Sequence, residues 1–369
     1  MVDIPSSCTR TIPCNSIKLF NKWCVIIMQN KRVVLVTGPP GNGRDEYLQQ
    51  AIKKLEKKVK TGYYHVFEYM QEVAPLYGVH NLTRDNVFII SKSTLERIRN
   101  DAFSKVVKEI QESDNEIDIV STPAVFRIRP WGGYLSGRVD GLTIEHIEQL
   151  RPTTMIVFID DLLRVRENMR KDAMWQKALG AVTLKDLAEW RHLAIELVQG
   201  YAEQTLPPKD WIIFAKEHRV DTFVDLLLGE KPRIYLSYHI TGHEEFTDVQ
   251  RFMKKLSDFF ICIDPYTIKD WDVVKAYDDA LRQMNKDAID IEIKYSDYCH
   301  RFSDIPLKEI EEAIDLIRTQ IVERDFQLIA NVHATVVYHR DEKPSYGVMA
   351  EIIHSLRVDR PVYLSLIHI

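Results

Sequence analysis

The sequence predicts an α/β protein with two domains, each a mainly parallel sheet flanked by helices. From Lys31 onward, apolar runs of strand length alternate with longer amphipathic segments, a pattern typical of parallel sheets covered by helices. The chain has 369 residues, whereas single hydrophobic cores stop growing at about 250 to 300 residues. We therefore expect two cores: a domain over residues 31–229 and a smaller, Rossmann-like domain over residues 233–363.

The first domain is predicted from four strands and the helices between them. The strands are expected at "RVVLVTG", "NEIDIVST", "TMIVFIDD" and "DWIIFAKE", and residues 45–60 read as the first amphipathic helix. A further helix should stop at Gly229, and residues 230–232 then form a short linker.

The second domain repeats this alternation on a smaller scale. Its strands are expected at "RIYLSYHI", "DFFICIDP", "HATVVYH" and "RPVYLSL". The clearest helix is "PLKEIEEAIDLIRTQIVERDFQLI", in which apolar side chains recur at helical spacing and should form a buried stripe. These side chains are Ile310, Ile314, Ile317 and Ile321.

The two ends of the chain are harder to interpret. Residues 1–30 lack the apolar core and cleavage signature of a secretory signal, so they are a leader of uncertain status: an added strand or a wrongly assigned start. The last six residues, "LSLIHI", resemble one reading frame of a common sequencing adapter. Residues 364–369 are therefore either a non-native tail or an authentic terminal strand.

Composition excludes several classes of function. A net charge of −5 and the lack of a basic block interleaved with aromatic residues argue against binding a nucleic-acid polymer. The longest apolar runs are strand-sized and fall short of the ~18 residues that span a bilayer, so we expect no membrane partner. Five cysteines without a CxxC pair favour free thiols, no metal site and a cytoplasmic location.

One loop has the pattern of a phosphate cradle. Gly38, Gly41 and Gly43 follow a strand and open a helix, where backbone N–H groups can wrap a phosphate at the positive helix end. The complete P-loop motif continues with lysine and then serine or threonine, but this chain has Arg44 and Asp45 there. Phosphoryl transfer is therefore not expected, although nucleotide binding without turnover remains open.

The region around this loop, residues 31–228, resembles archaeal-type adenylate kinases and related P-loop nucleotide kinases. The resemblance lies in "VTGPPGNGRDEY", "HVFEYMQEVAPLYGV", "STPAVFRIRPWGGYLSG" and "LRPTTMIVFIDDLLRVRENMRKDAMW". It implies a degenerate kinase-like domain that could hold ATP or another nucleotide with Mg²⁺, with lid remnants at Arg164, Arg166 and Arg170. Asp160 and Asp161 either hold Mg²⁺ through a water or cap the following helix.

A second loop lies near the end of the chain, in "ATVVYHRDEKPSYGVMAEIIHSLRVDRPVYL". With "RIYLS" and "ERDFQLI", this block resembles the nucleoside 2-deoxyribosyltransferase family, and most closely its 2'-deoxynucleoside 5'-phosphate N-hydrolase branch. Breaking an N-glycosidic bond builds positive charge on the sugar carbon, which a carboxylate can stabilise or attack. The resemblance assigns that role to Glu351.

The same resemblance implies roles for four other residues. Asp325 would be the acid that protonates the leaving base while Glu351 stays ionised, and Tyr235 would orient Glu351 by a hydrogen bond. Ser345 and the backbone N–H groups at the helix start, where Gly347 lies, would bind the substrate by its anionic 5'-phosphate. Three of the site residues also have a plain alternative: Glu351 as a surface glutamate, Asp325 in an ion pair with Arg324 or Arg318, and Ser345 as a turn residue.

These interpretations lead to one main expectation and two alternatives. We expect cleavage or transfer at the N-glycosidic bond of a 2'-deoxynucleoside or its 5'-monophosphate, without any required cofactor. The partner would be a small nucleoside or nucleotide, and the resemblance leaves a homodimer open. The alternatives are a P-loop nucleotide kinase that uses Arg44 and a nucleotide sensor without catalysis.

Overall fold

The computed structural model divides the chain into two units, Met1–Lys31 and Arg32–Ile369. The ranges that the structure describes are 31–128, 137–172, 175–176, 182–205, 210–240, 247–282, 287–339 and 345–366. The predicted leader, residues 1–30, lies outside them, as do Cys8, Cys14 and Cys24. The other two cysteines are free thiols, with Cys262 buried and Cys299 exposed.

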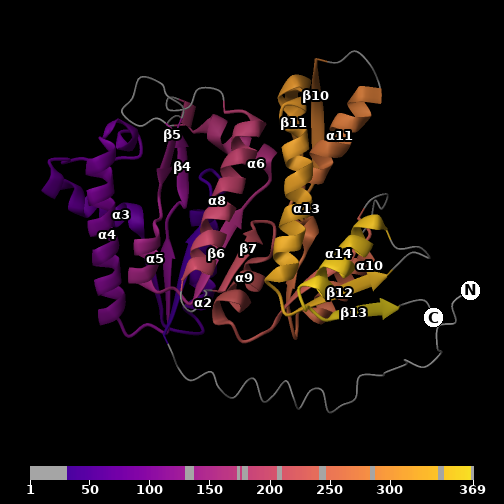
Figure 1. Ribbon diagram of the computed structural model, residues 1–369, viewed down its shortest axis with the longest axis horizontal. Helices are drawn as coiled ribbons and strands as arrows, with labels where there is room; N and C mark the ends of the chain where they lie inside the picture. Colours follow the sequence, from indigo (N-terminus) through magenta and orange to yellow (C-terminus); the bar gives the residue numbers. More distant parts are fainter. Residues whose placement is uncertain are drawn as a thin grey trace, which may run out of the picture. The chain divides into compact units, whose positions relative to one another are not determined.

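The first half of the second unit is built on a five-stranded parallel sheet (Figure 1). The sheet order is β2-β3-β1-β6-β7. Nearly every residue of these strands except those of β2 is buried, because helices cover both faces of such a sheet. The strands are β1 (Arg32–Thr37), β2 (Thr61–His65), β3 (Ile117–Ser121), β6 (Thr154–Ile159) and β7 (Asp210–Ala215).

Helices connect these strands, and several begin or end at recognisable caps. The Ser91 side chain accepts from Thr94 N at the start of α4, and Thr183 and Asp186 form a capping box for α8. Gly229 closes α9 with a φ of 66°. The helices are α2 (Arg44–Leu55), α3 (Val66–Val73), α4 (Lys92–Glu112), α5 (Ile144–Leu150), α6 (Leu162–Lys171), α8 (Leu184–Gln204) and α9 (Val220–Leu228).

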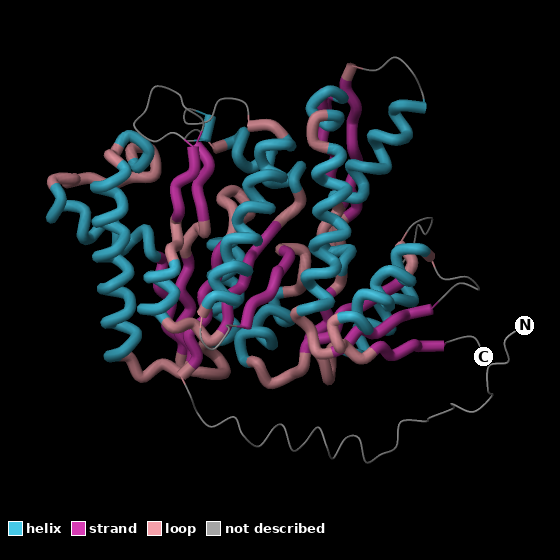
Figure 2. The backbone as a smooth tube through the Cα atoms, in the orientation of Figure 1, coloured by secondary structure: helices cyan, strands magenta, loops and turns pink. Residues whose placement is uncertain are grey.

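The second half holds a four-stranded parallel sheet of order β13-β12-β8-β9. Figures 1 and 2 show α14 lying against its strands, and α14 contacts β8, β12 and β13. The strands are β8 (Arg233–Tyr238), β9 (Ile261–Ile263), β12 (Ala334–His339) and β13 (Val362–Leu366). The helices are α10 (Thr247–Leu256), α11 (Asp270–Arg282), α12 (Leu307–Glu311), α13 (Ile314–Ala330) and α14 (Tyr346–Arg357).

The predicted fold class is confirmed, since both sheets are parallel and carry helices. Five strands were not predicted. One is β2 of the first sheet, and the others form two antiparallel pairs: β4 (Val125–Ile128) with β5 (Gly137–Asp140), and β10 (Ala288–Lys294) with β11 (Cys299–Pro306). The long predicted helix is divided into α12 and α13. Its apolar stripe is nevertheless present, because Ile310, Ile314 and Ile317 are buried and Ile321 is partly buried.

The two sheets share a continuous packing region. The predicted linker, residues 230–232, falls between the end of α9 and the start of β8. One apolar cluster nevertheless includes Phe214 of β7, Ile317 of α13 and Tyr235 of β8. Ile234 and Leu236, on the other face of β8, belong to a separate cluster under the four-stranded sheet. The domain boundary therefore stays a prediction.

Two further predictions concern the membrane and the chain end. None of the described helices is both long and apolar enough to cross a bilayer. Residues 364–366 belong to β13, where Leu364 pairs with Val337 of β12, and residues 367–369 lie outside the described part of the chain.

Candidate active site and a phosphate-loop site

Glu351 lies on α14 where this helix faces β8. The Tyr235 hydroxyl donates to Glu351 Oε1 at 2.8 Å, and the Ser237 hydroxyl donates to Glu351 Oε2. Tyr235 and Ser237 are two residues apart on one strand, so their side chains point to the same face. Both carboxylate oxygens of Glu351 are therefore held by hydroxyls from a buried strand, which rules against the plain alternative of a surface glutamate.

The surroundings of Glu351 favour its protonated form. Burial and the negative charge of Asp325 raise the pKa of Glu351 to about 8, although the hydrogen bonds from Ser237 and Tyr235 act in the opposite direction. Burial also raises the pKa of Tyr235 well above its ordinary value, with Asp325 and Glu351 adding to the effect. Tyr235 is therefore a hydrogen-bond donor at every physiological pH.

Asp325 lies on α13 and is paired with its neighbour. Arg324 Nη2 lies 2.9 Å from Asp325 Oδ1, and Arg324 Nε donates to the same oxygen at 3.1 Å. Burial raises the pKa of Asp325 despite this arginine, and the Asp264 carboxylate raises it further. The ion pair named as the alternative role of Asp325 is thus formed with Arg324, whereas Arg318 pairs with Asp278. Pairing does not remove Asp325 from the site, because its charge still acts on Glu351.

Ser345 and Gly347 lie in the first turn of α14. The Ser345 side chain caps the helix by accepting from Val348 N at 3.2 Å. Glu351 follows Ser345 by six positions, which is roughly 9 Å along a helix axis. Tyr346 between them is 97% exposed, so this end of α14 is open to solvent. The structure thus brings Tyr235, Glu351 and Asp325 together and places Ser345 and Gly347 at the exposed end of the same helix.

Two residues of this cluster were not predicted as site residues. Ser237 could have been found from its two-residue spacing to Tyr235 in "RIYLS", because alternate residues of a strand share a face. Arg324 had no such signal, since a charged residue on an amphipathic helix is ordinarily solvated. Its burial follows from the packing of α13 beneath the segment after β9, where Arg324 Nη2 donates to Pro265 O at 3.3 Å.

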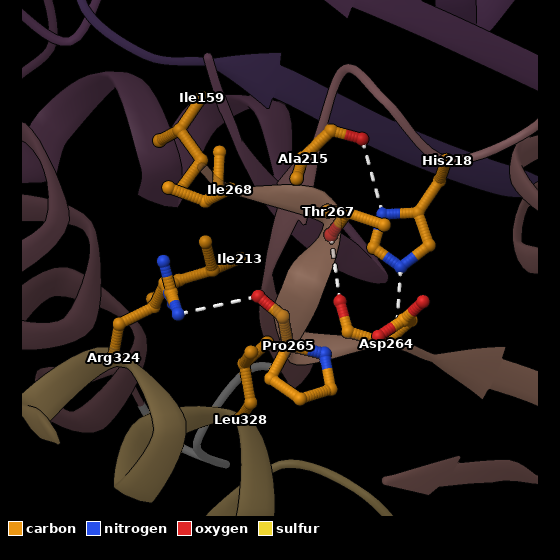
Figure 3. Close-up of a pocket in the computed structure, with 10 residues that line it drawn as sticks. All are labelled: Ile159, Ile213, Ala215, His218, Asp264, Pro265, Thr267, Ile268, Arg324 and Leu328. Carbon is orange, nitrogen blue, oxygen red and sulfur yellow. Dashed lines mark hydrogen bonds between the residues drawn. The ribbon is translucent and has the colours of Figure 1, made fainter. Parts of the chain in front are cut away.

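A small cavity lies beside Arg324, between α13, β7 and the segment that follows β9 (Figure 3). His218 bridges two of these elements: its Nδ1 lies 3.1 Å from Ala215 O, and its Nε2 accepts from Asp264 N at 3.2 Å. Burial lowers the pKa of His218, so this imidazole is neutral at physiological pH. The cavity volume is about 10 Å³, room for about one water molecule, so it is too small for a nucleoside.

The loop over residues 38–43 has the backbone shape of a phosphate cradle. Gly38 has a φ of 147°, and a side chain there would overlap the carbonyl oxygen of Phe158 in the neighbouring strand. Asn42, which was not predicted, is buried and pins the loop from inside. Its amide donates to Phe158 O at 2.7 Å and accepts from Arg44 N at 3.1 Å. The loop is therefore tied to the end of β6.

The Arg44 side chain is engaged in contacts within the protein. Its guanidinium is buried, donates to Thr122 O at 3.2 Å and donates to Asp45 Oδ1 at 3.2 Å. Asp45 also accepts from Ser121 at 3.0 Å and lies 3.5 Å from His65. Burial alone would raise the pKa of Asp45, but His65, Arg44 and Ser121 hold it well below its ordinary value. Both residues are thus engaged near the ends of β2 and β3.

Asp160 and Asp161 follow β6 and differ in how they are used. Asp161 occupies the cap position of α6 but makes no side-chain cap bond there; its carboxylate instead accepts from Lys269 N at 2.6 Å. Asp160 accepts from Arg164 at 2.8 Å through Oδ1, while its buried Oδ2 has no hydrogen-bond partner. Burial and the neighbouring carboxylates Asp160 and Asp270 raise the pKa of Asp161 to about 7.

The predicted lid arginines are held in ion pairs. Arg164 lies 2.7 Å from Asp160 and 3.4 Å from Glu217. Arg166 makes a bidentate pair with Glu309 at 2.8 and 2.7 Å, and Arg170 lies 3.5 Å from the same carboxylate.

A Mg²⁺ ion near this loop would find Asp160 Oδ2, a carboxylate oxygen that accepts no hydrogen bond from the described residues and lies 3.5 Å from Lys216 Nζ. No group of three or more histidine, cysteine, aspartate or glutamate side chains that could hold a metal occurs among the described residues. Mg²⁺ that accompanies a nucleotide needs only one or two carboxylates, because phosphates and water supply the other ligands. Asp160 Oδ2 fits that requirement, whereas both Asp161 oxygens are occupied by Lys269 N and Arg164.

Comparisons with known proteins add little to this picture. No family model and no curated protein matches the chain. Among solved structures, a GTPase from Pyrococcus abyssi in its apo form is similar at 13% sequence identity and a TM-score of 0.26. The match covers 54% of this chain and 97% of the GTPase chain. So low a score supports no functional argument, and the match gives no support to the deoxyribosyltransferase resemblance.

Proposed function

We propose that the second half of the protein cleaves, or transfers across, the N-glycosidic bond of a 2'-deoxynucleoside or its 5'-monophosphate. The observation that supports this proposal is the fixed position of Glu351, which two strand hydroxyls hold by both oxygens within the electrostatic reach of Asp325. A structural glutamate would more often have a cationic partner than two neutral hydroxyls and a second carboxylate.

Two neighbouring carboxyl groups can divide the chemistry between them. Like charges resist ionising together, so one group of the pair retains a proton up to the raised pKa of Glu351, about 8. The resting site favours this proton on Glu351, and the reaction uses the state in which it lies on Asp325 and Glu351 is ionised. Glu351 as the carboxylate attacks the sugar C1', forming an ester bond as the bond from C1' to the base nitrogen breaks. Asp325 gives its proton to the departing base. A water, or a second base, then attacks C1', the ester bond breaks, and the proton of the attacking group passes to Asp325.

Tyr235 and Ser237 orient Glu351 for this attack. Their hydrogen bonds fix the direction of the carboxylate and stabilise its ionised form, which is the nucleophilic one. At the other end of α14, the Ser345 hydroxyl and the first backbone N–H groups offer donors at the positive end of a helix. A 5'-phosphate there would lie at a distance that one nucleotide can span from Glu351.

The test is a chromatographic assay for free base. The full chain is incubated with each deoxynucleoside and each 5'-monophosphate, singly and with an acceptor base. We expect base release or exchange that is lost in Glu351→Ala and retained in Glu312→Ala, a matched change at an exposed glutamate between α12 and α13. Equal activity of the Glu351→Ala protein, or no product from the folded native chain with any substrate, would reject the proposal.

A second candidate function is supported by the loop over residues 38–43. It joins β1 to α2 at the carboxyl end of a parallel sheet. Nucleotides bind at such ends of parallel sheets. We infer that this loop binds the phosphates of a nucleotide, without phosphoryl transfer.

A further inference from the structure

Phosphate loops normally combine backbone N–H groups with a cation, and the cation of this loop is not obvious from its own residues. Arg44 occupies the expected position, but its side chain is buried against Thr122 O and Asp45. Reaching a phosphate in the loop would require Arg44 to give up both contacts. Another side chain must therefore supply positive charge if the loop binds an anion.

Lys216 reaches the loop from another strand. It follows β7 directly, and its backbone N–H donates to Ile159 O at the end of β6 at 2.9 Å. Its side chain crosses the end of β6 and reaches Gly43. An added Cβ atom on Gly43 would lie 2.3 Å from Lys216 Nζ and 3.0 Å from its Cε. The ammonium of a lysine that is distant in the sequence but adjacent in the sheet therefore lies directly beside the backbone of Gly43.

An ammonium group in this position requires a nearby anion to offset unfavourable electrostatics. Gly43 precedes the first residue of α2, and the N-terminus of a helix carries a partial positive charge that disfavours a cation. Within the described part of the chain, Lys216 Nζ is paired with one carboxylate oxygen, Asp160 Oδ2, at 3.5 Å. This distance is too long for a good hydrogen bond, and Asp160 Oδ1 is already paired with Arg164. Among the described residues, Lys216 Nζ donates no hydrogen bond.

Two buried polar atoms near the loop also lack hydrogen-bond partners among the described residues. Asp160 Oδ2 faces Lys216 and has no hydrogen-bond partner, although Asp160 is only 1% exposed. The hydroxyl of Thr37, the last residue of β1 before Gly38, is fully buried and likewise unpartnered. Buried polar groups are nearly always hydrogen-bonded in native proteins. Such groups at the base of a loop shaped for phosphate are accounted for by a ligand or by its bound water.

We propose that Lys216 is the phosphate-binding cation of the loop over residues 38–43 and takes the part that Arg44 does not play. This inference rests on the second candidate function, the binding of nucleotide phosphates. The ligand class is a nucleoside di- or triphosphate. When it binds, the Lys216 ammonium moves from its long contact with Asp160 to a phosphate oxygen, and its 28% exposed side chain gives solvent access for that exchange.

The first test measures binding of ATP, GTP and tripolyphosphate to the full chain by calorimetry, with Mg²⁺ present. The variants are Lys216→Gln, Arg44→Met and Lys54→Gln, the last a matched change of an exposed lysine on α2. We expect Lys216→Gln to weaken binding by about tenfold or more, as for the loss of one charge-assisted contact. Arg44→Met and Lys54→Gln should change affinity by less than about threefold.

The possible results distinguish the role of Lys216 from phosphate binding itself. Affinity that is unchanged in Lys216→Gln and lost in Arg44→Met would overturn the role of Lys216 while leaving phosphate binding intact. No binding of any of the three probes to the native chain would overturn both. Lys216→Gln removes the charge and leaves a shorter polar side chain, so a comparison of melting temperatures identifies a folding defect.

A second measurement needs no variant. The native chain is acylated with acetic anhydride, and modification of each lysine is followed by mass spectrometry with and without tripolyphosphate. We expect tripolyphosphate to slow the modification of Lys216 by several-fold and to leave Lys54 unaffected. Equal rates at Lys216 with a bound probe would contradict the proposal, even if the substituted protein were unstable.

Discussion

The Glu351 cluster (Glu351, Tyr235, Ser237 and Asp325) and the loop over residues 38–43 differ in which parts of their predicted motifs are present in the structure. In the cluster, the side chains that the sequence singles out meet: Tyr235 from β8 donates to Glu351 on α14, and Asp325 acts on it from α13. In the loop, the backbone has the expected shape, but the motif's own cation, Arg44, is buried in contacts with the protein. In the cluster the predicted side chains lie together. In the loop the backbone has the predicted geometry, but the predicted cation is engaged elsewhere.

The difference has a physical reason. The proposed nucleophilic chemistry needs a particular carboxylate at a particular place, so no other residue can substitute for it. A phosphate cradle depends on backbone N–H groups and on a positive charge nearby, and that charge can come from any element that reaches the loop. In this sheet β6 adjoins β1 and β7 adjoins β6, which puts Lys216 within reach.

The largest expected effect is the loss of activity when Asp325, the proposed general acid, is replaced. Asp325→Asn should lower base release by about 10² to 10⁴-fold, because a positioned general acid contributes about that much. The defect should shrink with a substrate whose leaving group needs no proton, such as a deoxyriboside of an acidic phenol. Glu351→Ala should remain inactive with that substrate.

A matched change for this prediction is Asp278→Asn, which removes the exposed partner of Arg318. Its activity should equal that of the native chain. If Asp325→Asn lost the same factor with both kinds of leaving group, Asp325 would hold the site together through Arg324 and would not act as the acid.

The second prediction is a pH dependence of stability that comes from Glu351. The pKa of this carboxyl is raised from 4.5 to about 8 in the folded chain, so the folded protein binds more protons than the unfolded one between these values. The contribution of Glu351 is therefore fully present below pH 4.5 and is lost as the pH rises toward 8. The loss is at most about 1.4 kcal/mol for each pH unit between the unfolded and folded pKa values.

Urea unfolding from pH 5 to pH 9 measures this loss. The free energy of unfolding of Glu351→Gln should increase relative to that of the native chain as the pH rises, because the amide cannot ionise. Glu312→Gln should follow the native curve. Parallel curves for the native chain and Glu351→Gln would show that Glu351 ionises at its ordinary pKa and that the cluster is less buried than its contacts indicate.

Much of this architecture could be predicted from the sequence, and particular residues show where prediction stopped. Strands such as β1 and β6 are continuous apolar runs between polar turns, so local pattern alone identifies them. The hairpin strand β11 has exposed residues at most positions, which leaves little apolar signal. The resemblance predicted that Glu351, Tyr235 and Asp325 meet. Lys216 could not have been found, because its proximity to Gly43 depends on strand order, which no local pattern encodes.

The third prediction tests whether Arg44 is structural. Arg44→Met removes two hydrogen bonds of a buried guanidinium and leaves Thr122 O without this donor, so the chain should lose about 1 to 3 kcal/mol of stability. The affinity for tripolyphosphate should stay within about threefold of the native value. Denaturant unfolding and calorimetry of the same preparation give both numbers. Unchanged stability with lost affinity would show that Arg44 binds the phosphate, as the motif predicts. The two sites would then not differ in this respect.

The smallest effect is expected at Tyr235, and it tests how the hydroxyls act on Glu351. The hydrogen bond from Tyr235 lowers the pKa of Glu351, so Tyr235→Phe should raise that pKa by about one unit, which corresponds to about 1.4 kcal/mol. The acid limb of the activity profile should then move to higher pH by the same amount, with activity at alkaline pH nearly restored. Tyr69→Phe, which removes a hydroxyl bonded to Glu109 at 2.6 Å, should leave the profile unmoved. A uniform loss of activity at every pH would mean instead that Tyr235 positions the carboxylate without stabilising its charge, and that the donor that lowers its pKa is Ser237.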